Sequence, residues 1–66
     1  MPIDIQKMKD LRERRNLTQE EAAKAARLPN KQSWSQIETG RRENITLETL
    51  DRIAEALGVK PQSLLK

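Results

Sequence analysis

The sequence predicts an all-α fold, a single domain of five short helices that spans residues 1–66. Apolar side chains recur three and four positions apart, which is the spacing of one face of a helix. Capping residues precede these runs, and no stretch alternates polar and apolar residues as a strand does. A chain of this length buries only about 60% of its unfolded surface, so we expect one small helical core.

The first predicted helix runs from about Asp4 to Arg15. Asp4 can cap its N-terminus with a side-chain oxygen, and Asn16 ends it. One face of this helix is apolar and is formed by Ile5, Met8 and Leu11.

The second predicted helix begins at Thr18, because Thr18 and Glu21 form the pattern of a capping box. The Thr18 hydroxyl can accept a hydrogen bond from the Glu21 N–H, and the Glu21 carboxylate can accept one from the Thr18 N–H. Leu28 closes the corner after this helix, and Pro29 prevents its continuation. The buried face carries small side chains that let another helix approach closely, namely Ala22, Ala23 and Ala26.

The third predicted helix follows a tight turn, with Asn30 as its N-cap and Gly40 as its left-handed stop. Trp34 and Ile37 lie three positions apart and should share the inner face. The opposite face carries the polar side chains Lys31, Gln32, Ser35 and Gln36.

The fourth predicted helix is capped by Thr46 and stopped by Gly58. Pro61 fits the first position of a short fifth helix that carries Leu64 and Leu65. The apolar stripe of the fourth helix consists of Leu47, Leu50, Ile53, Ala54 and Leu57.

The composition excludes several classes of protein. The chain has no cysteine and no histidine, which removes disulfides and the commonest metal ligands and general bases. We therefore expect no catalytic residues, no metal ion and no cofactor, and an enzyme is the poorest interpretation. No apolar run is long enough to span a bilayer and no secretory signal is present, so we expect a cytoplasmic protein without membrane contact.

The positive charge belongs to one part of the chain. Residues 1–42 hold ten basic and six acidic residues, whereas residues 43–66 hold three and four, so the two parts carry net charges of +4 and −1. A basic surface can serve to bind nucleic acid. Because charges of both signs are interspersed, an ordinary solvated surface would also explain it.

Three separated stretches resemble a known family. They are Leu17-Thr18-Gln19-Glu20-Glu21, the ending Ile37-Glu38-Thr39-Gly40, and the run from Thr46 to Val59. In this order they resemble the helix-turn-helix domain of the lambda-repressor and Cro type, and the resemblance covers about Met8 to Leu65. It implies a compact five-helix lambda-repressor-like fold, with the helix-turn-helix at the second and third helices. The turn departs from the family: it has one extra residue, and Arg27 stands where glycine is usual.

The resemblance implies a surface that binds DNA. An amide side chain can pair with adenine N6 and N7, and a lysine can donate to guanine O6 and N7. Without the motif, these would be ordinary exposed residues. The expected base-reading residues are Lys31, Gln32, Ser35 and Gln36. The expected phosphate-binding residues are Gln19, Ser33, Thr39, Arg41, Arg42 and Asn44, while Arg14 and Arg15 are weaker candidates that could form a solvated helix end.

Two further assignments concern the interior. Arg12 and Glu38 each border an apolar face, and the resemblance implies that they form a structural ion pair; two unrelated surface charges are the alternative. Trp34 is the only aromatic residue. It could wedge into or stack on nucleic acid, but its spacing favours the core.

We therefore expect a sequence-specific transcriptional regulator, a repressor or controller protein, that binds double-stranded DNA. One short helix reads only a few base pairs, which favours a homodimer on a two-fold operator. The alternative function is a protein-interaction module with the same fold, such as an antitoxin with a protein partner or the excised part of a larger regulator. The apolar residues available either for a dimer contact or for completing the monomer core are Ile45, Val59, Leu64 and Leu65.

Overall fold

The computed structural model describes residues 3–42 and 45–65, which form four α-helices and one turn of 3₁₀ helix. This part of the chain contains no strand, so the all-α prediction is confirmed. The elements, in order, are α1 (Ile5–Arg14), α2 (Gln19–Ala25), α3 (Lys31–Glu38), α4 (Leu47–Leu57) and η1 (Pro61–Leu64).

Each α-helix begins after the capping residue that the sequence predicts. The side chains of Asp4, Thr18, Asn30 and Thr46 each accept a hydrogen bond from the backbone N–H three residues ahead. At α2 the capping box is complete: the Glu21 N–H donates to Thr18 Oγ1 at 3.1 Å, and the Thr18 N–H donates to Glu21 Oε1 at 2.9 Å. These local bonds fix where each helix starts, whatever the rest of the chain does.

Each α-helix ends in a Schellman motif, in which a residue with positive φ reverses the chain. After α2, the Arg27 N–H donates to the Lys24 carbonyl at 3.0 Å, and the Leu28 N–H donates to the Ala23 carbonyl at 2.8 Å. Glycine adopts a positive φ freely, whereas the same conformation costs an arginine about 1 kcal/mol of stability. The positive-φ residues are Asn16 (57°), Arg27 (57°), Gly40 (80°) and Gly58 (71°).

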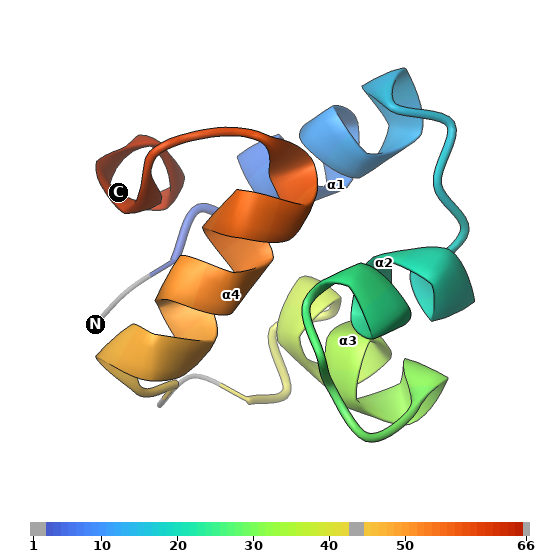
Figure 1. The fold of residues 1–66 in the computed structure, drawn as a ribbon. Coiled ribbons are helices and arrows are strands. Elements are labelled where there is room, and N and C mark those ends of the chain that lie inside the picture. Colours follow the sequence, from blue (N-terminus) through green and yellow to red (C-terminus); the bar gives the residue numbers. More distant parts are fainter. Residues whose placement is uncertain (1–2, 43–44, 66) are drawn as a thin grey trace.

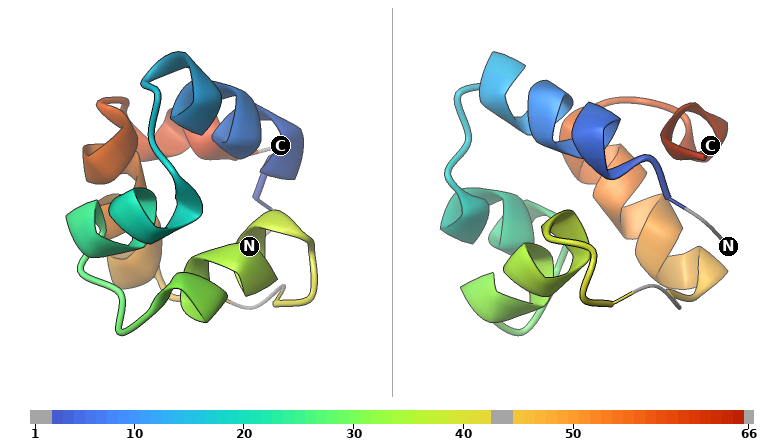
Figure 2. Two further views of the ribbon diagram at one scale, coloured as in Figure 1. Left: turned by 90° about the vertical axis from the view of Figure 1, so that its right-hand side faces the viewer. Right: turned by 180° about the vertical axis from the view of Figure 1, so that it is seen from behind.

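The helices pack around one core. α2 contacts both α3 and α4, and α1 contacts the same two helices. Figures 1 and 2 show α2 and α3 side by side at the end of the molecule away from the two chain termini. Near those termini, the Asp4 N–H donates to the Leu64 carbonyl at 2.6 Å, and Ile3 pairs with Leu65 in an isolated bridge. The largest fully buried side chains are Trp34, Met8, Ile37, Leu50, Ile53, Leu57 and Leu64.

Two sequence expectations need correction. Leu47 is 64% exposed, although it continues the apolar stripe of α4. Helical side chains lean toward the N-terminus, so a residue in the first position of α4 points past the end of the core. The fifth predicted helix is only η1, whose four residues close with i→i+3 bonds as a 3₁₀ turn.

The apolar residues of the C-terminal part mainly complete this core. Leu64 is fully buried and Ile45 is 7% exposed. Val59 and Leu65 are half-buried and pack against the same core. In a single chain, therefore, these side chains already have a packing role.

Among the described residues, no helix is long and apolar enough to cross a membrane.

Candidate nucleic-acid interface

The turn between α2 and α3 places the third helix. It comprises residues 26–30, with Arg27 at positive φ, Leu28 half-buried and Asn30 capping α3. The Asn30 side chain accepts from the Ser33 N–H at 3.0 Å. α3 therefore begins at Lys31, where the sequence predicts it.

Two buried residues determine which way α3 faces. Trp34 and Ile37 are both 0% exposed, as their spacing predicts. Lys31, Gln32 and Gln36 are exposed, and Ser35 is half-buried. Because each residue advances about 100° around the helix, the burial of Trp34 and Ile37 leaves these polar side chains on the open face.

The outward face of α3 is hollowed. A shallow depression of about 260 Å³ is lined by Gln32, Ser35, Gln36, Thr39 and Arg41. No hydrogen bond among the described residues uses the side-chain amide of Gln32 or Gln36, so both amides are open to a ligand. Lys31 lies apart from this depression, in a groove of about 270 Å³ that α2 and the turn also line. The structure thus groups three of the four expected base-reading residues.

The expected phosphate-binding residues differ in how free their donors are. Arg41 and Arg42 are exposed, just after the C-terminus of α3. The Ser33 hydroxyl donates to Asn30 Oδ1 at 3.2 Å, and the Thr39 hydroxyl donates to the Ser35 carbonyl at 2.8 Å. A hydroxyl has one proton, so Ser33 and Thr39 can donate to a phosphate only after they rotate. Asn44 lies outside the described residues.

The two arginines at the end of α1 are not among the residues that line the depression on α3, and Arg14 instead borders a depression lined by Asp4 and residues of α1. Both arginines are exposed. A methyl group at Gly58 would lie 2.6 Å from Nη1 of Arg15, so the Arg15 guanidinium packs over the end of α4. This position agrees with the alternative in which the arginines form a solvated helix end.

Away from the exposed polar face of α3, Arg12 and Glu38 form a contact that joins α1 to α3. Arg12 Nε and Nη2 donate to Glu38 Oε1 at 3.2 and 3.1 Å, and Arg12 Nη1 donates to the Leu17 carbonyl at 2.7 Å. The side chains of Arg12 and Glu38 are 13% and 4% exposed. The pair is therefore largely removed from water. Charges interact more strongly in such a buried setting than on the surface.

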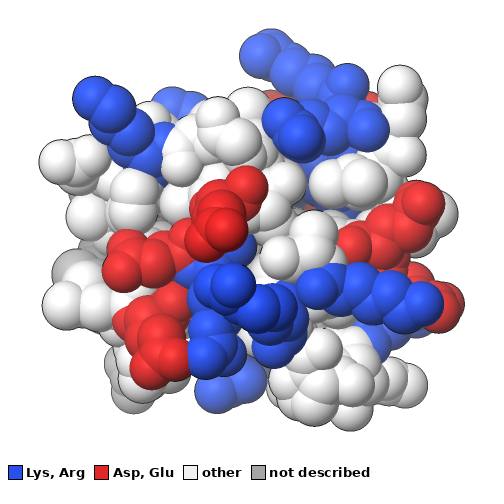
Figure 3. Space-filling model, viewed as in Figure 1, with Lys and Arg blue, Asp and Glu red and all other residues white. Residues whose placement is uncertain are grey.

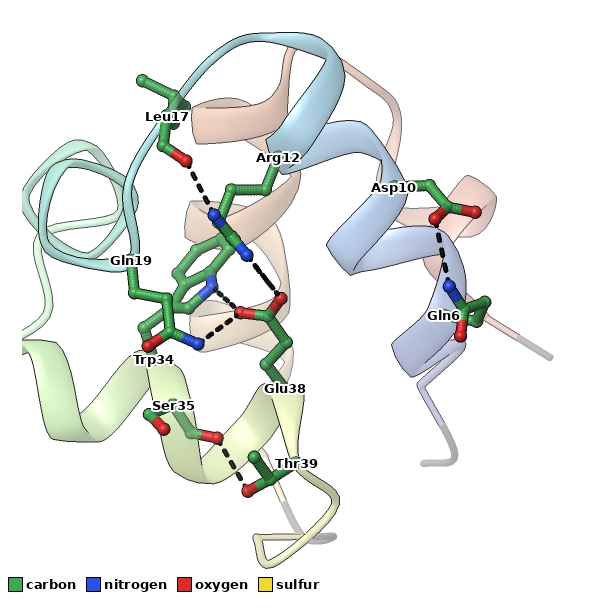
Figure 4. A network of polar contacts seen from close by, with 9 residues as sticks. All are labelled: Gln6, Asp10, Arg12, Leu17, Gln19, Trp34, Ser35, Glu38 and Thr39. Carbon is green, nitrogen blue, oxygen red and sulfur yellow. Dashed lines mark hydrogen bonds and ion pairs between the residues drawn. The ribbon is translucent and has the colours of Figure 1, made fainter.

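The other oxygen of the same carboxylate binds two further residues. Trp34 Nε1 donates to Glu38 Oε2 at 2.7 Å, and Gln19 Nε2 donates to it at 3.1 Å. Figure 4 shows side chains from α1, α2 and α3 converging on Glu38. Among the described residues no buried side-chain polar atom lacks a partner, so this network meets the requirement for burying a charge.

The bonds of Trp34 and Gln19 to Glu38 were not predicted from the sequence. Trp34 and Glu38 lie four positions apart on one helix, a spacing that allows side-chain contact, and this was the only signal in the sequence. Gln19 is separated from Glu38 by 19 positions and meets it only because α2 packs on α3.

Gln19 lies in the first turn of α2, together with Glu20 and Glu21. Hydrogen bonds from the Thr18 backbone and side chain lower the pKa of the Glu21 carboxyl below its ordinary value. Glu21 therefore stays ionised at neutral pH and opposes an anion at this helix end. A phosphate contact here would depend on the Gln19 amide, which has two hydrogens and uses one on Glu38.

Charge alone does not single out a binding face. Figure 3 shows basic and acidic side chains interspersed on the face seen in Figure 1. Two exposed ion pairs, Arg27 with Glu55 and Arg52 with Glu48, further balance the charges around α4. By contrast, α3 has Lys31 at its start and Arg41 and Arg42 after its end, so cations flank both ends of its exposed polar face.

Comparison with protein families matches residues 6–66 to the helix-turn-helix domain family. The match covers most of the chain, which therefore belongs to this family. The helix-turn-helix pair consists of α2 and α3, and membership supports DNA as the general class of ligand. Searches of curated proteins and of solved structures gave no match.

Proposed function

We propose that this protein is a sequence-specific transcriptional regulator of the lambda-repressor and Cro type, a repressor or controller protein, and that α3 enters the major groove of double-stranded DNA. The observation that carries the proposal is the orientation of α3. Trp34 and Ile37 are fully buried, while Gln32 and Gln36 present unpartnered amides on the opposite face. In helix-turn-helix proteins the second helix of the pair is the one that reads bases.

Base reading is assigned to the depression on α3. Gln32 and Gln36 lie one turn apart and border it together with Ser35. A glutamine amide offers a donor and an acceptor side by side, which matches adenine N6 and N7 in the major groove. Ser35 can donate to a base or a phosphate. Lys31 lies at the edge of this surface and can donate to guanine O6 and N7 or to a phosphate of the DNA backbone.

Backbone binding is assigned to residues around α3. Arg41 and Arg42 provide cations after its C-terminus, and Gln19 provides an amide hydrogen from the start of α2. Such contacts fix the register of a protein on DNA without reading sequence. Ser33 and Thr39 can join them if their hydroxyls leave their present acceptors. Asn44 is retained as a proposed contact from the sequence alone.

A homodimer is proposed because the short reading helix covers few base pairs. Two copies on half-sites one helical turn apart would give a two-fold operator. Leu47, 64% exposed, is the one large apolar side chain that the described residues leave open. Sedimentation with and without a two-fold duplex tests the dimer: one chain bound per specific duplex at saturation would rule it out.

Selection of bound duplexes from a random pool, followed by binding of variants, tests the function. Gln32→Ala and Gln36→Ala should each reduce the preference for the selected sequence over random duplex by about 1–3 kcal/mol per lost bidentate contact. The matched control is Gln62→Ala, which removes an exposed amide from η1 and should change nothing. If both α3 variants keep full preference, the reading face is wrong. If the pool yields no bound duplex, the proposal fails, and a protein-interaction module would replace it.

A further inference from the structure

The Glu38 carboxylate has no free acceptor position. A carboxylate offers about four lone-pair sites. Two N–H groups of Arg12 occupy Oε1, and the Trp34 indole and the Gln19 amide occupy Oε2. Each of the three donors comes from a different helix of the fold.

The three donors are not equally rigid. Arg12 reaches only Oε1, so its two bonds would let the carboxylate swing about that oxygen. Trp34 is 0% exposed, and its ring cannot turn without repacking the core. Its bond to Oε2 is the shorter of the two, 2.7 Å against 3.1 Å for Gln19. The indole therefore fixes the position of the oxygen to which Gln19 binds.

The Gln19 amide can rotate about its terminal torsion, unlike the fixed ring of Trp34. Gln19 is half-buried at the start of α2, and the terminal torsion of a glutamine is broad. Without a fixed acceptor its amide would sample many orientations. With Oε2 fixed, one hydrogen of the amide is held on Glu38 and the other has a defined direction.

We propose that Trp34 is a positioning residue for binding of the DNA backbone: through Oε2 of Glu38, its indole N–H orients the Gln19 amide so that the second amide hydrogen meets a phosphate oxygen. This rests on the proposed function, in which Gln19 is a phosphate ligand. Trp34 itself touches no DNA. The bond thus links the core of the domain to one contact at its surface.

The test is a double-mutant cycle on duplex DNA. Trp34→Phe removes the N–H and keeps an aromatic ring. At fixed salt it should weaken binding to selected and random duplexes alike, by about three- to tenfold per folded molecule. In a Gln19→Ala background the same substitution should cause no further loss. The positioning role is overturned if Trp34→Phe leaves the affinity unchanged. It is also overturned if Trp34→Phe causes the same loss of affinity in the Gln19→Ala background as in the wild type.

A merely structural effect needs its own control. Ile37→Val removes one methylene from the same helix face without touching the network, and should leave affinity per folded molecule unchanged. If Trp34→Phe does not fold, chemical synthesis of the 66-residue chain with benzothienylalanine at position 34 replaces only the N–H by sulfur. The same cycle is then measured with that chain.

A second measurement needs no DNA. In the NMR spectrum of the free protein, the Gln19 amide hydrogen that binds Glu38 should be shifted downfield and should exchange slowly. Loss of the indole N–H should move the chemical shift and the exchange rate of this hydrogen toward those of a free amide. If neither changes, the proposal is overturned. If the spectrum responds but affinity does not, the positioning role fails while the proposed function stands. If the wild-type protein binds no duplex at all, both fail.

Discussion

Replacing Glu38 with alanine should remove a large part of the stability of the fold. The substitution leaves Arg12, whose side chain is 13% exposed, without its carboxylate, although the bond to the Leu17 carbonyl remains. It also leaves the N–H of the fully buried Trp34 without an acceptor. Breaking a buried ion pair from one side costs about 3–5 kcal/mol. A domain of 66 residues has a free energy of unfolding of about 3–10 kcal/mol, so the variant should be partly unfolded at room temperature.

Urea melts of Glu38→Ala, Arg12→Ala and the double variant measure this effect. The coupling between the two substitutions should lie within about 0.5–3 kcal/mol, because both act on one network. Glu38→Gln keeps the shape and one acceptor oxygen and should lose less, so it extends the series if the alanine variant is too unstable to melt.

The matched control is Glu48→Ala. Glu48 pairs with Arg52 on the same helix, but its side chain is 72% exposed, and an exposed pair contributes at most about 1 kcal/mol. If Glu38→Ala costs no more stability than Glu48→Ala, or if the effects of Glu38→Ala and Arg12→Ala add without coupling, the network does not stabilise the fold.

Three further predictions follow from the turn, the capping box and the cations. Arg27→Gly should be more stable than Arg27→Ala by about 1 kcal/mol, since both lose the exposed contact with Glu55 but only glycine relieves the positive φ; equal urea midpoints would exclude this strain. The Glu21 pKa is lowered in the fold, so its contribution is present above the pKa of the unfolded chain and is lost as pH falls through the lowered value. The stability advantage of the wild type over Glu21→Gln should therefore shrink between about pH 5 and pH 3, and a pH-independent difference would contradict the capping bond. Arg41→Ala should reduce the slope of log affinity against log salt by about 1 if Arg41 binds a phosphate, and an unchanged slope would remove that contact.

Short-range features of the sequence accounted for much of the secondary structure. Asp4, Thr18, Asn30 and Thr46 cap the four α-helices as predicted, because a capping bond spans only three residues. The glycine stops at positions 40 and 58 are confirmed for the same reason. Leu47 was misplaced because periodicity indicates a face of a helix but not where along it the core ends.

The proposed site divides in the same way. The exposed face of α3 could be predicted, since burying Trp34 and Ile37 leaves Gln32 and Gln36 outside. The hydrogen bonds that hold the hydroxyls of Ser33 and Thr39 could not be predicted. A hydroxyl proton has several nearby acceptors, and the acceptor it binds depends on the geometry of the fold. Which of the expected residues contact DNA stays a prediction.

The sequence by itself determined the four α-helices, their capping residues and the polar face of α3, because these depend on periodicity and on contacts a few residues apart. Only the tertiary structure decided that Arg12, Gln19 and Trp34 share one carboxylate. α1 and α2 must first pack on α3 before the donor hydrogens of Arg12 and Gln19 come within hydrogen-bond distance of Glu38, whereas the Trp34 bond lies within α3. The same packing leaves the charge buried with all its bonds made, and it joins the core to the surface proposed to meet DNA.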